Sequence, residues 1–579
     1  MKSTGLMQHL SFGNWGSMIR WLALALVLGL ALVATACASS TRNGTEPAPT
    51  ATPTEEPGTT PTQRASTPTG EAQPSGETVE GGVLRRLFSD PATLDPHLTT
   101  DATSAAIIVE VFGGLVTINP QLEVVPDIAE SWSVSDDGRV YTFFLREDAV
   151  FHNGKPITAN DFKWSLERAA DPVTGSLVVD QYLGDIVGVK EKLRGGAREI
   201  EGVRVIDDHT LEITIDQPKA YFLSKLTYPT AFVLDRENVE SGRRWTRTPN
   251  GSGPFKLGEY VPGERLVLER NPNYHLGPPY LDKVELILGG GTAMLMYEND
   301  EIDITGVGLA DLDRLLDPNN SLNAELQRAL PSFSTSYIGM NTAEPPFDDV
   351  KVRQALNYAI NKQEIATLVL ADLVTPAKGI LPPGFPAFNA NLKGYEYNPE
   401  KARQLLSESK YGDDLENFPP IILTVSGGFG ASVGLDLEVI TESWSTELGI
   451  EVEFQQTEFA TYLQDLHKGR FQMFKIAWIA DYPDPENFLD ILFYSESSNN
   501  STQYSNPEVD QLLLQARTET DQAKRYQLYQ QAEEIIVDEA PWIPLWHSGE
   551  QYVLVKPRVK DYYLTQLIVP RFRFVRLTN

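Results

Sequence analysis

Hydrophobic and polar positions follow two different periods along most of the chain. Apolar residues at every second position, or in short continuous runs, are typical of strands, whereas longer amphipathic segments are typical of helices. The strand-like segments are residues 140–145, 210–215, 265–269 and 450–454. The helix-like segments are residues 350–361, 399–409 and 506–538. Because the two kinds of segment are mixed along the chain, the part from Gly81 onward is predicted to be a mixed α/β protein.

The segment after Asn398 has a clear helix start. The Asn398 side chain can accept a hydrogen bond from the first turn, and Pro399 suits the first helical position. Glu400 then lies near the positive end of the helix dipole. We therefore predict that a helix begins at Pro399.

The first forty residues have a pattern of their own. Lys2 and Arg20 precede an apolar run over residues 21–33, and small residues follow up to Ala36. A basic start, a short apolar run and small residues form an export signal. The run is shorter than the roughly 20 residues that span a bilayer, although residues 34–36 could extend it, so a retained anchor is the alternative. We predict that residues 1–36 are a signal peptide.

Cys37 is the only cysteine of the chain, which excludes disulfides within the chain, cysteine zinc clusters and thiol redox pairs. Residues 33–37 resemble the bacterial lipoprotein processing box, in which the cysteine is lipidated and becomes the new N-terminus. Ala34 stands where that box usually has leucine. The resemblance implies a lipid anchor at Cys37, since several acyl chains hold a protein stably at a membrane. The alternative is that Cys37 is only a small residue of the signal.

Residues 41–80 form a tract of Pro and Thr with almost no apolar side chains. Such a tract has nothing to bury and is predicted to be a disordered linker. At about 3 Å per residue, roughly 40 residues reach up to about 100 Å. We therefore assign residues 37–80 to a lipidated cysteine and a linker that tethers the folded body.

Chain length and net charge limit the number of packed units and the classes of ligand that are expected. A chain of 579 residues is too long for one ordinary core, so two or three packed units are expected. The net charge of -31 argues against nucleic-acid binding, which needs a basic surface. Acidic balance is common in soluble proteins and indicates no particular ligand.

Several sequence motifs of the common enzyme classes are absent. The chain has no His-Glu-x-x-His pair, no G-x-x-x-x-G-K-[ST] loop and no strand followed by G-x-G-x-x-G. Among the seven scattered histidines, His152 and His547 could be metal ligands or structural residues. We expect no catalytic residues, no cofactor and no metal site.

A series of short segments resembles one known family. Residues 125–146 alone predict only a turn followed by a strand, but they resemble the signature of the family 5 extracellular solute-binding proteins. Further matches cover nearly all of residues 81–579 in order: they are residues 93–96, 151–162, 250–256, 269–274, 339–356 and 478–485.

The resemblance implies a two-lobed α/β clamp of the periplasmic-binding-protein type, with an extra subdomain in the first lobe and the ligand buried between the lobes. The expected first lobe comprises residues 81–112, 235–335 and 548–579. Its subdomain comprises residues 113–234, and the second lobe comprises residues 336–547.

In peptide-binding members of the family, an aspartate in a Trp-x-x-Asp segment contacts the α-amino group of the peptide. The resemblance gives this role to Asp481. A closed cleft desolvates the ammonium group, and a paired carboxylate offsets that cost. The alternative is that Asp481 caps a turn before Pro483.

Other site residues follow from the same resemblance. Trp478 is expected to line a side-chain pocket or to pack in the core. Lys475 stands where relatives can have an arginine that binds the peptide carboxylate, and lysine lacks the bidentate geometry of arginine, so a solvated surface lysine is the alternative. The backbone positions expected to bond the ligand like an added strand are Thr100, Ala102, Ala477 and Ile479.

The function implied is that of the substrate-binding component of an ABC-type importer, which captures short peptides and delivers them to membrane permease subunits. A nickel chelate, an oligosaccharide or another small solute is the alternative ligand. A membrane-tethered sensor or an enzyme on the same clamp is the alternative of another class. The chain is expected to be an exported monomeric lipoprotein on the outer face of the cytoplasmic membrane.

Overall fold

The computed structural model describes residues 78–412, 415–427 and 433–578. The predicted signal peptide, Cys37 and almost all of the predicted linker lie outside the described residues. Within the part that is described, no helix combines the length and the apolar character needed to cross a membrane.

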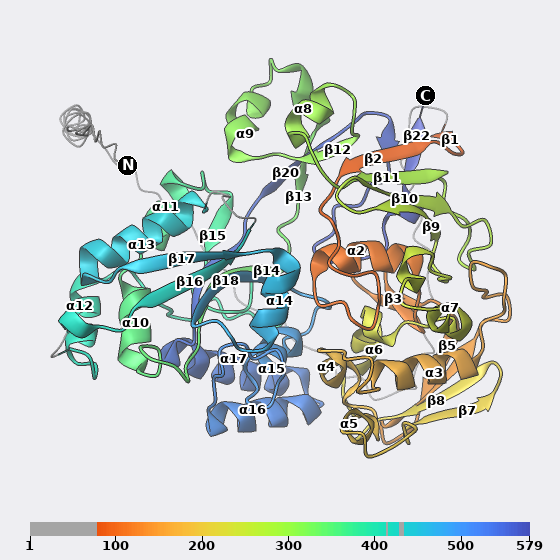
Figure 1. Cartoon of the computed structure of the whole chain (residues 1–579), viewed down its shortest axis with the longest axis horizontal. Coiled ribbons are helices and arrows are strands. Elements are labelled where there is room, and N and C mark those ends of the chain that lie inside the picture. The colour runs from red at the N-terminus through yellow and green to blue at the C-terminus, as the bar shows by residue number, and fades with distance from the viewer. Residues whose placement is uncertain (1–77, 413–414, 428–432, 579) are drawn as a thin grey trace, which may run out of the picture. The chain divides into compact units, whose positions relative to one another are not determined.

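Two large sheets organise the described chain (Figure 1). One sheet has the order β13 (Leu326–Ala329), β20 (Gln551–Val555), β12 (Ile304–Gly306), β2 (Val83–Leu87), β11 (Lys283–Ile287), β10 (Arg265–Arg270) and β9 (Phe255–Val261). The other has the order β15 (Val374–Pro376), β19 (Trp542–Ser548), β14 (Ser334–Met340), β18 (Met473–Ile479), β16 (Ile421–Ser426) and β17 (Val452–Thr457).

Three smaller sheets accompany the seven-stranded sheet. An antiparallel sheet has the order β5 (Ala129–Val134), β6 (Val140–Leu145), β8 (Thr210–Thr214) and β7 (Val203–Asp207), and the pair β3 (Val116–Ile118) and β4 (Val124–Pro126) precedes it in the chain. The third contains β1 (Thr78–Val79), β22 (Arg576–Thr578) and β21 (Val559–Lys560).

Helices fall into two groups along the chain. The first group is α2 (Ala102–Val111), α3 (Ala159–Ala169), α4 (Val179–Leu183), α5 (Val189–Leu193), α6 (Phe222–Lys225), α7 (Arg236–Glu240), α8 (Ala293–Glu298) and α9 (Leu309–Leu316). The second group is α10 (Val350–Tyr358), α11 (Lys362–Leu368), α12 (Pro399–Ser407), α13 (Leu435–Leu448), α14 (Phe459–His467), α15 (Glu486–Phe493), α16 (Pro507–Thr518) and α17 (Gln522–Glu539).

The chain passes between the two large sheets twice, once between β13 and β14 and once between β19 and β20. We call the elements β1 to β13 with β20 to β22 the first lobe, and the elements β14 to β19 with their helices the second lobe. Within the first lobe, β3 to β8 and α3 to α6 form the subdomain. The residue limits given for these parts from the sequence stay predictions.

Local sequence accounts for several element boundaries. The Asn398 side chain accepts a hydrogen bond from the Lys401 N–H at 2.9 Å, so α12 begins as predicted. The single helix predicted over residues 506–538 is wrong, because α16 ends at Thr518 and α17 begins at Gln522. Asp521 starts the second helix by accepting a hydrogen bond from the Lys524 N–H at 3.0 Å. The apolar pattern runs through both helices and does not show the break.

One apolar cluster crosses from the first lobe to the second. It contains Tyr182 and Tyr228 of the first lobe together with Tyr482 and Phe488 of the second, all of them buried. Burying aromatic side chains of this size is a large apolar gain. The cluster therefore packs the two lobes against each other beside the cavity described next.

Candidate ligand-binding cavity

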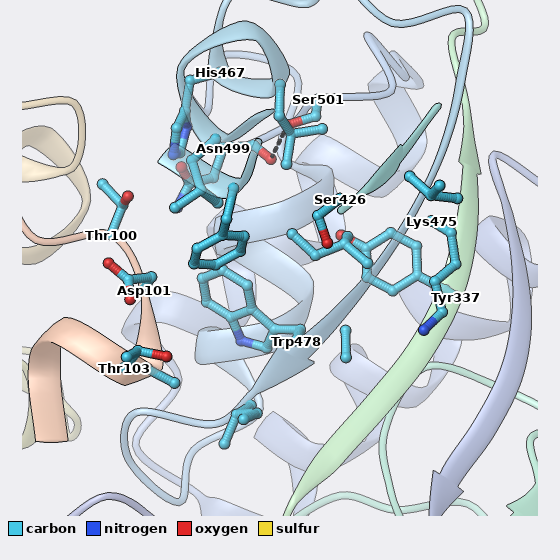
Figure 2. Close-up of a pocket in the computed structure, with 18 of the residues that line it drawn as sticks. Thr100, Asp101, Thr103, Tyr337, Ser426, His467, Lys475, Trp478, Asn499 and Ser501 are labelled. Atoms are coloured by element: carbon cyan, nitrogen blue, oxygen red, sulfur yellow. Dashed lines mark hydrogen bonds between the residues drawn. The ribbon is translucent and has the colours of Figure 1, made fainter. Parts of the chain in front are cut away.

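A cavity of about 430 Å³ lies between the lobes and takes its walls from both. Figure 2 shows Thr100, Asp101 and Thr103 on one side and Tyr337 and Lys475 on the other, with Trp478 between them. The volume falls in the range of about 300 to 1,000 Å³ that is usual for small-molecule sites. The remaining side chains of the wall are largely apolar, among them Tyr228, Leu437, Phe459, Leu463, Leu466, Leu492 and Ile568.

One edge of β18 is open along the cavity. β18 pairs with β14 over its whole length, but β16 pairs with it only at Met473 and Phe474. The Lys475 carbonyl accepts a hydrogen bond from the Tyr462 hydroxyl at 2.9 Å on the side away from β14. Backbone groups alternate sides along a strand, so those of Ala477 and Ile479 also point away from β14. No described strand takes up these groups, and they form a template for an added strand.

Asp481 lies just beyond the end of this strand edge. Its Oδ2 accepts hydrogen bonds from the Tyr182 hydroxyl at 2.5 Å and from Asn487 Nδ2 at 3.0 Å. Asn487 Oδ1 in turn accepts from the Asp481 N–H at 3.0 Å and from Trp478 Nε1 at 3.2 Å. Asn487 therefore fixes the positions of both Asp481 and Trp478.

The closed cavity disfavours the charge of Asp481. Burial raises the pKa of its carboxyl group to about 6, although the hydrogen bonds from Asn487 and Tyr182 oppose the shift. A cation placed beside the carboxylate would remove this penalty. The geometry therefore suits a ligand that carries an ammonium group.

Lys475 is the cationic counterpart of Asp481 in the same cavity. Its side chain is half-buried, and its ammonium group has no hydrogen-bond or ion-pair partner among the residues that the structure describes. Asp436 also lines the cavity, and its Oδ2 accepts a hydrogen bond from Trp546 Nε1 at 3.2 Å. An unpaired ammonium group in a closed cavity is a suitable partner for a ligand carboxylate.

The first lobe contributes the start of α2. Thr100 and Ala102 flank Asp101, whose Oδ1 caps the helix by accepting a hydrogen bond from the Ser104 N–H at 2.9 Å. This cap fixes the loop that faces β18. Tyr228 supports the same loop, because its hydroxyl donates to the Thr99 carbonyl at 3.2 Å.

The structure brings all the site residues named from the sequence to this one cavity. They are Thr100, Ala102, Lys475, Ala477, Trp478, Ile479 and Asp481. Their roles in binding stay predictions. Three residues that organise the site were missed, namely Tyr182, Tyr228 and Asn487. Asn487 lies only six positions after Asp481, which is a usable signal, whereas the two tyrosines carry none.

The two histidines considered as metal ligands lie elsewhere. His152 Nε2 lies 3.1 Å from the Gly253 carbonyl, and His547 Nδ1 lies 3.0 Å from Thr335 Oγ1. Burial lowers the pKa of His152 to about 4 and that of His547 to about 3, so both rings are neutral at pH 7. Across residues 78–412, 415–427 and 433–578, no group of three or more metal-ligating side chains is placed to hold an ion.

A two-lobed α/β fold that encloses a cavity between its lobes defines the class of binding proteins that close around a solute. The family model described as bacterial extracellular solute-binding proteins, family 5 Middle, matches residues 123–500. This chain belongs to that family, as its sequence predicted.

Individual relatives cover most of the chain. It is 32% identical over 507 residues to the periplasmic oligopeptide-binding protein OppA of Escherichia coli, covering 83% of this chain and 89% of OppA. It is also 32% identical over 498 residues to the probable deoxycholate-binding periplasmic protein YgiS of Escherichia coli, covering 82% of this chain and 89% of YgiS.

The fold is similar to that of the murein tripeptide binding protein MppA of Escherichia coli. The TM-score is 0.79 at 29% identity, with 87% of this chain and 99% of that chain covered. This likeness confirms the predicted two-lobed fold class.

The lobes of this chain are in a closed arrangement. An unliganded open form of MppA gives a TM-score of only 0.62 at the same 29% identity, 87% coverage of this chain and 99% coverage of that chain. Contacts across the lobes agree with this difference. Gln181 of α4 donates to Ser498 Oγ at 3.0 Å and accepts from Asn499 Nδ2 at 2.9 Å.

Proposed function

We propose that this chain captures short peptides between its lobes and delivers them to the permease subunits of an ABC-type importer. The observation that carries the proposal is the position of the Asp481 carboxylate, in the cavity and just beyond the open edge of β18. A peptide laid along that edge bonds to the backbone of Ala477 and Ile479 as an added strand. Its α-amino group then reaches Asp481. Such bonds recognise the ligand backbone, so many side chains are accepted.

Lys475 supports the same orientation of the ligand. It lies at the other end of the open edge, six positions before Asp481. A short peptide has a cation at one end and an anion at the other, and the cavity has the complementary pair. Trp478 lies between the two charged residues in the sequence, lines the cavity and offers an aromatic wall for a side chain.

An apolar carboxylate is the second candidate ligand. The wall of the cavity is largely apolar and aromatic, and YgiS, named as a probable deoxycholate-binding protein, is as similar in sequence identity as the oligopeptide-binding relative. Such a ligand would pair with Lys475 and leave Asp481 without a cation. The two candidates therefore differ in whether Asp481 is needed.

Mass spectrometry of the small molecules released from the denatured chain tests the proposal. We expect mixed short peptides from the wild type and few from Asp481→Asn. Asp436→Asn is the matched control, because it removes an equal charge from the same cavity at a residue away from the strand end. A bile-acid-like carboxylate, a metal chelate or an oligosaccharide in place of peptides would overturn the peptide assignment and leave the family intact.

A binding comparison tests the role of Asp481 directly. A recovered peptide and its N-acetylated form are titrated into the wild type and Asp481→Asn. Acetylation removes the ammonium group, so it should weaken binding to the wild type by about 30-fold or more and have little effect on the variant. An equal acetylation penalty in both proteins would contradict the assignment.

We propose that the protein is an exported monomer, held at the outer face of the cytoplasmic membrane by lipid on Cys37, and that it returns its ligand chemically unchanged. Support comes from the leader pattern of residues 1–36 and from the family. Recovery of an added peptide in full, after prolonged incubation, tests the absence of turnover.

A further inference from the structure

A buried ion pair joins the two lobes outside the cavity. Lys225, the last residue of α6 in the subdomain, lies with its Nζ 2.8 Å from Oε1 of Glu486, the first residue of α15 in the second lobe. Both side chains are only 4% exposed. Figure 1 shows α4 and α6 of the subdomain on the side where α15 lies. A contact of this kind exists only while the lobes are together.

Lys225 keeps other partners within its own lobe. Its Nζ lies 3.1 Å from Asp185 Oδ2 and donates to the Gln181 carbonyl at 2.7 Å. Burial opposes the charge of Lys225, but Asp185 and Glu486 outweigh it and raise the pKa of the ammonium group. When the lobes separate, Lys225 therefore stays charged and partnered, and it loses only Glu486.

Glu486 depends on the contact more strongly. Burial raises the pKa of its carboxyl group and neighbouring Asp490 adds to the effect, whereas Lys225 opposes it. In the closed form the Lys225 ammonium group is the cation that favours the ionised form of this buried carboxyl group. Removing one partner of a buried charge pair leaves the other uncompensated, which is costly.

The pair is connected to the cavity through one short turn. Glu486 accepts a hydrogen bond from the Tyr482 hydroxyl at 2.5 Å, and Tyr482 follows Asp481 directly. Asn487, which follows Glu486, holds both Asp481 and Trp478 in place. The ion pair at Glu486 is therefore connected to the turn that carries Asp481.

We propose that Lys225 and Glu486 are positioning residues for ligand capture: their ion pair stabilises the closed form and sets the turn 481–487 without touching the ligand. The ligand measurements rest on the proposed function, whereas the lobe closure itself does not. Because the pair joins the two lobes and neither residue lines the cavity, its loss should speed release of the ligand more than it slows entry.

The subdomain offers a matched control. Lys219 is equally buried, at 5% exposure, and its Nζ lies 2.5 Å from Asp185 Oδ1 and 2.8 Å from Asp216 Oδ1. Both of these ion pairs are within the subdomain. Lys219→Met therefore carries the cost of losing a buried lysine next to Asp185 without breaking a contact between the lobes.

Closure can be read with two fluorophores, because Cys37 is the only native thiol. We would use the full chain with Cys37→Ser, Val173→Cys in the first lobe and Leu368→Cys in the second, at side chains that are 94% and 75% exposed. Single-molecule energy transfer gives the closed fraction without ligand and the ligand concentration that closes half of the molecules. The probe is tri-alanine. If tri-alanine leaves the wild type open, the mixture released from the denatured wild type replaces it, and that failure counts against the proposed function alone.

We expect Glu486→Gln and Lys225→Met each to raise the half-closing concentration and the release rate about tenfold or more. The double variant should be no worse than the more affected single variant, since both break the same pair. Lys219→Met should stay within about twofold of the wild type. The proposal is overturned if Glu486→Gln closes like the wild type, or if Lys219→Met impairs closure as much as Lys225→Met.

Discussion

The hydroxyl group of Tyr182 lies 2.5 Å from the carboxylate of Asp481, although the two residues are 299 positions apart and belong to different lobes. Tyr182 also stacks on Tyr228, with ring centroids 3.7 Å apart and an interplanar angle of 5°. Tyr228 in turn holds the loop at Thr99. Asp481, the carboxylate proposed to bind the ligand's amino group, therefore receives the Tyr182 hydrogen bond from the first lobe only when the clamp is closed.

Tyr182→Phe should weaken peptide binding without unfolding the chain. The variant keeps the stacked ring and loses one hydrogen bond to a charged group, which is worth about 1.5 to 3 kcal/mol, so the affinity for a recovered peptide should fall by roughly 10-fold or more. Isothermal titration calorimetry measures the change. Tyr228→Phe is the control, because its hydroxyl bonds to a carbonyl of its own lobe. Equal losses in the two variants would show that Tyr182 acts through packing alone.

Peptide affinity should fall as the pH drops below about 6. In the empty closed site burial holds the pKa of Asp481 at about 6, above its ordinary value of 3.8. A ligand ammonium group favours the carboxylate and lowers this pKa, so binding releases a proton at pH values between the lowered pKa and about 6. Affinity is then fully present above pH 6 and declines by up to about tenfold per unit below it.

Calorimetry between pH 7.5 and pH 4.5, in buffers with different ionisation enthalpies, measures both the affinity and the proton release. Asp481→Asn has no proton to lose at this position, and its weaker affinity should change much less over the same range. A wild-type affinity that rises toward pH 4.5 would contradict the predicted sign.

Local patterns in the sequence were sufficient for the parts of the fold that short segments determine. The alternation over residues 140–145 matches β6 (Val140–Leu145), and the cap at Asn398 matches the start of α12. The segment from Lys475 to Asp481 also has a local cause, because an extended strand places alternate backbone groups on one edge. The residues named in it accordingly lie together at the cavity.

The contacts between the lobes could not be predicted, because they depend on how segments far apart in the sequence meet. Tyr182 and Lys225 contact the second lobe only in the closed arrangement, and nothing in their own segments indicates a partner about 260 to 300 positions away. The sequence also did not indicate the end of α16. Asp521 caps a new helix, α17, while the apolar pattern continues through both helices. Contacts that form between lobes leave no period in the sequence.

Cys37→Ser separates a lipid anchor from a retained apolar anchor. Residue 37 lies outside the described part of the chain, so this prediction rests on the sequence. Expressed in a bacterium, the wild type should incorporate labelled palmitate and partition with membranes, because several acyl chains anchor stably. The variant should incorporate none and should keep its apolar leader. A variant that is cleaved and membrane-bound like the wild type would show that Cys37 is only part of the signal.

Lys475→Met should remove the recognition of a ligand carboxylate. The wild type is expected to bind a free peptide about fivefold more tightly than the same peptide with a C-terminal amide, since a half-buried ion pair contributes roughly 1 kcal/mol. In Lys475→Met this difference should disappear while the penalty for N-acetylation remains. Lys475→Arg should keep or strengthen the preference, because the guanidinium group can bind a carboxylate through two hydrogen bonds. Titrations of the three ligands into the three proteins measure these differences. If the amide and the free acid bind the wild type equally, Lys475 is a solvated lysine of the cavity wall, and the orientation of the ligand rests on Asp481 alone.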